Sequence, residues 1–264
     1  MKKLLSLAAT LLLAGCSSSG PGGSNSQTLT VAATAVPHAE ILKEVKPILA
    51  KQGVDLDIKV FADYVQPNTQ VVEKSIDLNY FQTKPYLDTF NREHNTQLVI
   101  ITGVHIEPFG AYSHKYKSIE QLPSGATVTL PNDPSNEGRA LLLLARNGLI
   151  TLKDPNNELA TPKDVVTNPK NLVFKPLEAA MLPRTLDEVD LALINTNYAL
   201  AAGLNPGKDA LLIENKDSPY VNYLVGRPDN KDDPRVQKLA QALTSPQVKA
   251  FIEQKYHGAV LPAF

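Results

Sequence analysis

The feature that most constrains the fold is an alternation of short apolar segments with amphipathic ones along most of the chain. The apolar segments predict strands at residues 29–33, 55–61, 98–106, 126–130, 172–176, 189–194 and 210–213, with a further strand inside residues 75–87. Helical patterns lie between many of them, notably at residues 34–53, 133–148 and 233–255. Strands that alternate with helices form parallel sheets, so the chain is predicted to be an α/β protein.

The predicted elements divide into two groups. Residues 108–112 and residues 218–225 are interpreted as crossovers between these groups. We therefore expect two parallel-sheet-containing lobes joined by two crossovers, with lobe 1 formed by residues 27–108 plus 224–264 and lobe 2 by residues 109–223. Two chain crossings between lobes are expected to act as a hinge.

The N-terminus has the pattern of a bacterial secretory signal. Residues 1–15 carry Lys2 and Lys3 before a run of apolar residues that is too short for a membrane span, which needs roughly 20. The sequence Leu-Ala-Gly-Cys at residues 13–16 resembles a lipobox, so Cys16 is predicted to be lipidated and to anchor the chain in a lipid bilayer. The Gly/Ser-rich residues 17–26 that follow are expected to be a flexible linker.

Composition and motifs exclude several classes of function. The chain has 26 basic and 27 acidic side chains, so no basic excess favours a nucleic-acid partner. The sequence has no nucleophile elbow, zinc-protease motif or phosphate-binding loop, so we predict neither an enzyme nor a cofactor. None of the histidines pair at metal-ligand spacing, so no metal site is expected. The histidines are His38, His94, His105, His114 and His257.

Residues 129–147 form the strongest candidate for a binding site. Asp133 is a suitable N-cap, Pro134 suits the first helical turn, and Gly148 can end the helix in the left-handed conformation. Asn136 and Arg139 are three residues apart and share one face near the positive end of the helix dipole. This pattern predicts a site for a carboxylate or a phosphate. The alternative is a solvated arginine beside a helix cap.

Other polar and aromatic residues follow predicted strands, where open α/β sheets bind ligands. Tyr64, Phe81 and Tyr86 are candidates for a cleft wall, although aromatic residues also pack in cores, and Asn195 directly follows a strand. The helix after that strand is expected to have Asn197 as its cap. We interpret His38 and Glu40 as capping or solvent-facing residues at a helix start.

Six segments in the same order resemble a known family, the NlpA/MetQ methionine-binding lipoproteins. They are TAVPHAEIL (34–42), DYVQPN (63–68), FQTKPYLD (81–88), PNDPSNEGRALLLL (131–144), LDEVDLALINTNYA (186–199) and SPYVN (218–222). The resemblance covers essentially the whole chain after the linker. It implies a two-lobed periplasmic-binding-protein fold of type II that closes over a free amino acid in the cleft between the lobes.

The resemblance also implies roles for individual residues. Arg139 and Asn136 would hold the α-carboxylate of L-methionine, while Asn195 and Asn222 would bind its backbone polar groups. An aromatic wall would suit the polarizable thioether, and its members would be Tyr64, Phe81 and Tyr86. The family partners are the membrane permease and ATPase subunits of an ABC importer, with the protein body lipid-anchored at the cell membrane and facing the periplasm or cell exterior.

Thr83 departs from the family pattern, because members usually carry histidine at the third position of the segment FQTKPY. Threonine is smaller and lacks an aromatic contact, so the pocket is expected to be looser there. This leaves open another amino acid, a methionine derivative or a short peptide as the ligand. A surface lipoprotein or adhesin of the same fold is a further alternative.

We expect the substitution Thr83→His to sharpen selectivity for methionine over other amino acids, because the imidazole ring would add an aromatic contact to the thioether. The measurement is a calorimetric competition of other amino acids against methionine in both proteins. Unchanged competition would contradict the assignment of Thr83 to the pocket.

Overall fold

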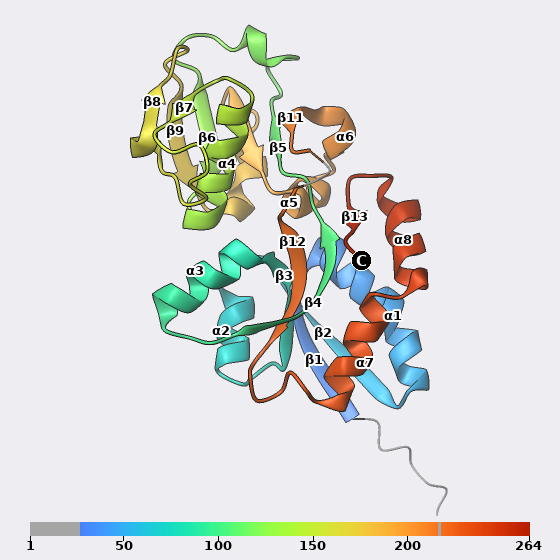
Figure 1. Cartoon of the computed structure of the whole chain (residues 1–264). Helices are drawn as coiled ribbons and strands as arrows, with labels where there is room; N and C mark the ends of the chain where they lie inside the picture. The colour runs from blue at the N-terminus through green and yellow to red at the C-terminus, as the bar shows by residue number, and fades with distance from the viewer. Residues whose placement is uncertain (1–26, 216–217) are drawn as a thin grey trace, which may run out of the picture.

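The structure is a computed structural model that describes residues 27–215 and 218–264, so the predicted signal, Cys16 and the linker lie outside the described residues. Two sheets form two lobes stacked one above the other in Figure 1. This confirms the predicted two-lobed α/β fold. Across the described ranges, no helix combines the length and apolar character that a membrane crossing requires.

Lobe 1 is built on a six-stranded mixed sheet. Its strands are β1 (Gln27–Thr34), β2 (Val54–Phe61), β3 (Leu78–Thr83), β4 (Val99–Ile106), β12 (Val221–Gly226) and β13 (Leu261–Pro262). In the order β13-β4-β12-β3-β1-β2, the strand β1 pairs in parallel with β2 and β3, whereas β12 runs antiparallel to β3 and β4. Strand β13 also runs antiparallel to β4, so both antiparallel members come from the C-terminal part of the chain, which returns to lobe 1 and ties its two segments together.

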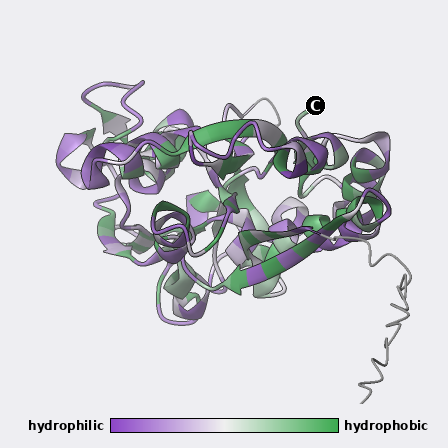
Figure 2. Cartoon of the chain, turned by 90° about the horizontal axis from the view of Figure 1, so that it is seen from below, coloured by the Kyte–Doolittle hydropathy of each residue, from purple (hydrophilic) through white to green (hydrophobic). Residues whose placement is uncertain are grey.

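Helices cover both faces of this sheet (Figure 1). They are the π-helical turn η1 (Ala35–Ala39), α1 (Glu40–Lys51), α2 (Gln66–Val72), α3 (Lys84–His94), α7 (Pro234–Leu243) and α8 (Pro246–Tyr256). Figure 2 shows hydrophobic residues along the strands and mixed colouring around the outer helices. The predicted helical region at residues 233–255 is two helices, because Ser245 caps α8 and Pro246 opens it.

Lobe 2 contains a five-stranded sheet with the order β11-β5-β10-β6-β9. Its strands are β5 (Gly110–Tyr112), β6 (Thr127–Pro131), β9 (Val173–Leu177), β10 (Leu191–Ile194) and β11 (Ala210–Ile213), with a small ribbon of β7 (Thr151–Leu152) and β8 (Val165–Thr167) beside them. The lobe's helices are α4 (Pro134–Arg146), α5 (Thr196–Ala201) and α6 (Pro206–Asp209), with the 3-10 turns η2 (Ile119–Gln121), η3 (Pro162–Asp164) and η4 (Ala179–Thr185).

The chain crosses between the lobes after β4 and again before β12. The expected end of lobe 2 at residue 223 falls inside β12, whose residues pair with β4 of lobe 1 from Val221 onward. Lobe 2 therefore ends a few residues earlier than the pattern of apolar residues indicated. The difference arises because the apolar pattern indicates where a strand lies and does not indicate which sheet it joins.

Two helices start at the cleft: the start of α4 follows the capping rules, and the start of α5 does not. Asp133 caps α4 by accepting a hydrogen bond from the backbone N–H of Asn136, and Gly148 is left-handed with φ of +75°, as predicted. The prediction of Asn197 as a cap is wrong: α5 begins one residue earlier at Thr196, and its N-cap Asn195 makes no capping bond with its side chain. The side chain of Asn195 is therefore available for another contact.

Helix α4 packs closely against the loop after β7 at Gly138. A Cβ atom at this glycine would lie 2.1 Å from the backbone oxygen of Glu158 and 3.0 Å from the backbone nitrogen of Ala160. Backbone atoms cannot move aside as a flexible side chain can. Glycine at this position therefore sets how near the helix lies to the loop.

We expect Gly138→Ala to lower the free energy of unfolding by about 1–3 kcal/mol, because the added methyl group overpacks the helix–loop contact. Gly207→Ala is the matched control, since its Cβ would meet only the side-chain oxygen of Asn205 at 3.5 Å. The control should leave stability unchanged or raise it slightly. Urea unfolding of both variants checks the contrast, and equal stabilities would contradict the packing argument.

Candidate functional site

A cavity lies between the lobes and holds about 360 Å³ of space free of protein atoms, part of it open to solvent. All eight residues that the sequence singled out for ligand binding line it: Tyr64, Phe81, Thr83, Tyr86, Asn136, Arg139, Asn195 and Asn222. The structure adds four lining residues that the sequence analysis did not select: Gln82, Glu107, Thr196 and Asn197.

The helix-start pattern predicted Arg139 as part of an anion site. In the structure, its side chain is already bonded to acceptors of the protein. Its Nε and Nη2 atoms donate to the two carboxylate oxygens of Glu214 at 2.8 and 2.5 Å, and Nη2 also donates to the backbone oxygen of Glu107 at 2.9 Å. Its guanidinium lies 4.1 Å from the ring centre of Tyr220. Nη1 makes no hydrogen bond within the described ranges, so this one edge of the guanidinium remains for a ligand.

The Arg139–Glu214 pair is buried, with 5% and 6% of the two side chains exposed. Burial alone would raise the pKa of Glu214, but the neighbouring guanidinium outweighs it and holds this pKa below its ordinary value. Both groups are therefore charged in the folded protein. The pair fixes the position of Arg139, because a planar guanidinium bound by two parallel hydrogen bonds cannot rotate without losing one.

Two amides continue from the start of α4 to the cavity. Asn136 donates from Nδ2 to both carboxylate oxygens of Asp133 at 3.0 Å. The Oδ1 atom of Asn136 accepts a hydrogen bond from Nδ2 of Asn195 at 2.9 Å. The Oδ1 atom of Asn195 is buried and has no hydrogen-bond partner. A buried acceptor without a donor is costly, and here it belongs to a residue that lines the cavity.

Aromatic rings form the other side of the cavity. The ring centre of Tyr64 lies 5.8 Å from those of Phe81 and Tyr86, and Phe81 lies 5.7 Å from Tyr86. The hydroxyl of Tyr86 donates to the backbone oxygen of Tyr64 at 2.9 Å, which fixes the two rings relative to each other. These three residues therefore form a continuous apolar wall that belongs entirely to lobe 1.

Hydrogen bonds across the cleft hold the lobes together. The hydroxyl of Tyr64 donates to Oδ1 of Asn197 at 2.6 Å, and the hydroxyl of Tyr198 donates to the backbone oxygen of Ala62 at 3.0 Å. The rings of Tyr64 and Tyr198 also lie 5.0 Å apart. Because these contacts join lobe 1 to lobe 2, the structure represents a closed arrangement of the lobes.

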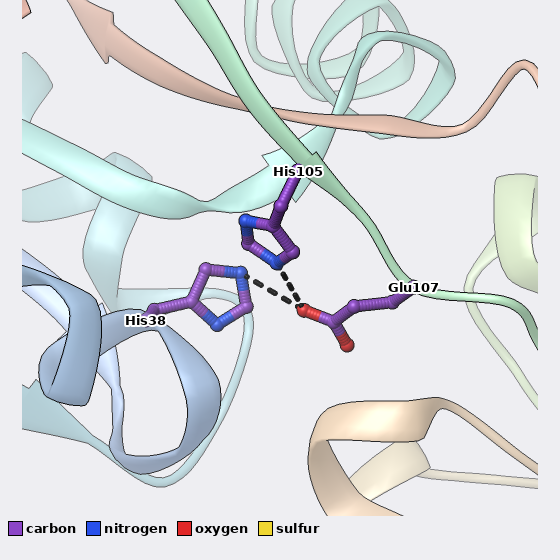
Figure 3. A group of neighbouring side chains, drawn as sticks. All are labelled: His38, His105 and Glu107. Atoms are coloured by element: carbon purple, nitrogen blue, oxygen red, sulfur yellow. Dashed lines mark hydrogen bonds and ion pairs between the residues drawn. The ribbon is translucent and has the colours of Figure 1, made fainter. Parts of the chain in front are cut away.

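Two of the histidines that appear scattered in the sequence meet at the hinge (Figure 3). His38 and His105 both point their Nε2 atoms at Oε1 of Glu107, at 3.3 and 2.7 Å. The spacing of the histidines along the chain did not indicate that these two meet in space. The expectation that His38 caps a helix or faces solvent is wrong, because it is 1% exposed.

The remaining ring nitrogens of the pair are also bonded. Nδ1 of His38 lies 2.7 Å from the hydroxyl of Thr34, and Nδ1 of His105 is bonded to the hydroxyl of Tyr80. Nε2 of His38 lies 3.1 Å from Oδ1 of Asn222, a cavity residue. The hydrogen bonds therefore fit neutral rings protonated at Nε2, with each hydroxyl donating to Nδ1.

Burial changes the acidity of this cluster. It lowers the pKa of His38 to about 4 and that of His105 to about 3, because the charged ring loses hydration. Burial also raises the pKa of Glu107, while His38 and Arg139 act in the opposite direction. The two neutral rings and the carboxylate are the group in the described residues that could present ligand atoms to a metal, all within 4.8 Å. A metal would have to displace both Nε2 protons and their hydrogen bonds.

A sequence signal for this cluster exists. His38 follows the first strand, and His105 and Glu107 stand at the end of the fourth, so each lies at a strand's carboxyl end. The aromatic candidates lie at equivalent positions, where strands end.

We expect the free energy of unfolding to fall as the pH drops from 7 to 5.5. The unfolded histidines take up protons near pH 6.5, whereas the buried rings stay neutral until about pH 4 for His38 and about 3 for His105. The loss is about 1 kcal/mol per pH unit for each ring below pH 6.5. Glu107 acts in the opposite direction at lower pH, because its raised pKa lets the folded state take up a proton first.

Urea unfolding across this pH range, compared between the wild type and His105→Gln, measures the effect. Glutamine can still donate to Glu107 but does not titrate, so the variant should show a shallower slope. His257→Gln, at an exposed position, is the matched control and should retain the wild-type slope. Equal slopes for all three proteins would contradict the buried-histidine explanation.

Known proteins are similar to this chain in sequence and in fold. The NlpA lipoprotein family model matches residues 29–264. The D-methionine-binding lipoprotein MetQ of Yersinia pestis is 42% identical over 257 residues, covering 97% of this chain and 94% of the relative. A nutrient binding protein from Burkholderia cenocepacia, solved bound to methionine, is 43% identical with a TM-score of 0.87 and covers 89% of this chain and 100% of its own. An ABC transporter periplasmic substrate-binding protein from Coxiella burnetii is 42% identical with a TM-score of 0.85, at 89% and 100% coverage. Because the family model spans almost the whole chain, this protein belongs to the NlpA lipoprotein family.

Proposed function

We propose that this protein is a lipid-anchored substrate-binding protein that captures methionine in the cleft between its lobes and delivers it to an ABC importer. It acts by binding and not by catalysis. The names of its relatives support this assignment, since one is a D-methionine-binding lipoprotein, one was solved with methionine and one is an ABC transporter periplasmic substrate-binding protein.

The observation that carries the proposal is a set of polar groups in the cavity, three of which have no protein hydrogen-bond partner among the described residues. The buried Oδ1 atom of Asn195 is an acceptor that lacks a donor, and the Glu107 carboxylate also lines the cavity. Among the described residues, neither Nη1 of Arg139 nor Nδ2 of Asn222 donates to a protein acceptor. The first two suit an ammonium group and the last two suit a carboxylate, which together are the charged groups of a free amino acid.

The aromatic wall supports methionine as the side chain of that amino acid. A thioether is polarizable and gains from contact with aromatic rings, and Tyr64, Phe81 and Tyr86 offer three of them. Thr83, partly buried at the end of β3, lies directly across the strand pair from Asn222. It therefore lines the cavity beside Asn222.

Ligand capture follows from closure of the lobes. Arg139, Asn136 and Asn195 belong to lobe 2, while the aromatic wall and Asn222 belong to lobe 1. A ligand that contacts both sets binds the closed arrangement more tightly than the open one, and this difference in affinity drives closure. The hydrogen bonds of Tyr64 and Tyr198 across the cleft then add to the closed state without touching the ligand's charged ends.

The anchor completes the proposal. Lipidation of Cys16 and the linker after it would place the body within reach of the permease and ATPase subunits at the cell membrane, facing the periplasm or cell exterior. This part of the chain lies outside the described residues, and the lipoprotein relatives support the assignment.

We expect the purified protein, unfolded and refolded to remove bound ligand, to be stabilised by methionine by about 2.7 kcal/mol at 100 times the dissociation constant. Asn195→Ala should weaken methionine binding about 10- to 100-fold, because an ammonium group loses a charge-assisted hydrogen bond. Asn147→Ala, at the opposite end of α4, is the matched control and should bind as the wild type does.

Thermal unfolding and calorimetric titration with the common amino acids measure both effects. Stabilisation by methionine above all others supports the proposal. A folded protein that no free amino acid stabilises would overturn it.

A further inference from the structure

We propose that Asp133 is a positioning residue that fixes the direction of the Asn195 amide and so makes the cleft select an ammonium group at the ligand's α-position. This inference rests on the proposed function, since it concerns how the same cleft reads an amino acid. It assigns a task to a residue that caps helix α4 and is not among the residues that line the cavity.

The first step is the chemistry of an ionised carboxylate, which accepts hydrogen bonds and donates none. Asp133 receives three donors at its Oδ1 atom, each at 3.0 Å: the backbone N–H of Asn136, the Nδ2 atom of Asn136 and the hydroxyl of Ser135. Its Oδ2 atom receives Nδ2 of Asn136 as well, also at 3.0 Å. Asn136 must therefore turn its NH₂ group toward Asp133 and its oxygen away.

The second step passes this direction to the next amide. The oxygen of Asn136 can only accept, so the group of Asn195 that faces it at 2.9 Å must be the NH₂ group. A reversed Asn195 would set two oxygens against each other, and a reversed Asn136 would set its oxygen against the Asp133 carboxylate. Both amides are buried, with 6% and 8% exposed, so water cannot relieve either clash.

The third step is the outcome at the cavity. Because its NH₂ group faces Asn136, Asn195 turns Oδ1 the other way, and this buried atom has no protein donor. An acceptor fixed in this way strengthens the binding of a ligand that donates a hydrogen bond to it. It weakens the binding of a ligand that places an unprotonated oxygen there. Asp133 thus determines, through the amides of Asn136 and Asn195, which kind of ligand group the cleft accepts.

The hydrogen-bond chain predicts a specific discrimination. Methionine and its α-keto acid, 4-methylthio-2-oxobutanoate, share the side chain and the carboxylate, but the keto acid has an acceptor in place of the ammonium donor. The wild type should therefore strongly prefer methionine. If the amide of Asn195 were free to reverse, its NH₂ group could donate to the keto oxygen, and the preference should shrink.

The test is the ratio of the two dissociation constants, measured calorimetrically with methionine and the keto acid. Asp133→Asn keeps the shape of the side chain and a good N-cap, but its amide can face Asn136 with either an oxygen or an NH₂ group. We expect the ratio to fall about tenfold or more, from weaker binding of methionine and relaxed rejection of the keto acid. Asn136→Ala interrupts the same chain one residue later and should lower the ratio in the same direction.

The matched control is Asp233→Asn. Asp233 caps α7 in lobe 1, is also followed by proline, and accepts a hydrogen bond from the backbone N–H of Arg235. This variant changes an aspartate cap to the same degree without reaching the cleft, so its ratio should equal that of the wild type. A general effect of losing a helix cap would instead move both aspartate variants together.

The outcomes separate the inference from the proposed function. A lower ratio in Asp133→Asn and Asn136→Ala, with the control unchanged, supports the positioning role. A wild type that binds methionine tightly, together with an unchanged ratio in Asp133→Asn, overturns the inference and leaves the proposed function standing. A folded wild type that binds no α-amino acid overturns the proposed function itself.

Discussion

The interaction on which the rest of the structure depends is the bonding of Glu107 at the first crossover. Both buried histidines of lobe 1 point their Nε2 atoms at its carboxylate, and its backbone oxygen accepts a hydrogen bond from Arg139 of lobe 2. A buried carboxylate is stable only when donors surround it, and here the donors come from segments that are far apart in sequence. The hinge is therefore defined by hydrogen bonds as well as by chain connectivity, and the cleft opens beside it.

Around this hinge the protein satisfies most of its buried polar groups and leaves a few for a ligand. Two nitrogens of Arg139 donate hydrogen bonds to Glu214, and these bonds hold the guanidinium in place with one edge toward the cavity. Asn136, which the sequence marked as a direct ligand contact, lines the cavity and also bonds to Asp133 and Asn195. The site therefore contains residues that face the cavity and residues that orient them. Both kinds are of the same amino-acid types, so the sequence does not distinguish them.

Much of this organisation could be predicted from the sequence, for identifiable physical reasons. The strand and helix periods indicated an α/β fold, and the Asp-Pro start and glycine end of α4 have local causes in capping and left-handed backbone geometry. The cleft residues were found because they follow strands or resemble a family motif. The histidine cluster joins His38 and His105, which are 67 positions apart by number, and only their shared place at the carboxyl ends of strands links them in the sequence.

The sequence by itself determined the elements, the order of the lobes and the types of side chain offered to the cleft, since these depend on local periodicity, capping and composition. Only the tertiary structure decided which polar groups form hydrogen bonds within the protein and which stay open to a ligand. The partner of Arg139 is Glu214, 75 residues away, and the donor to Asn136 is Asn195, 59 residues away. Hydrogen-bond partners are chosen by distance and direction in space, and burial then makes that choice costly to change.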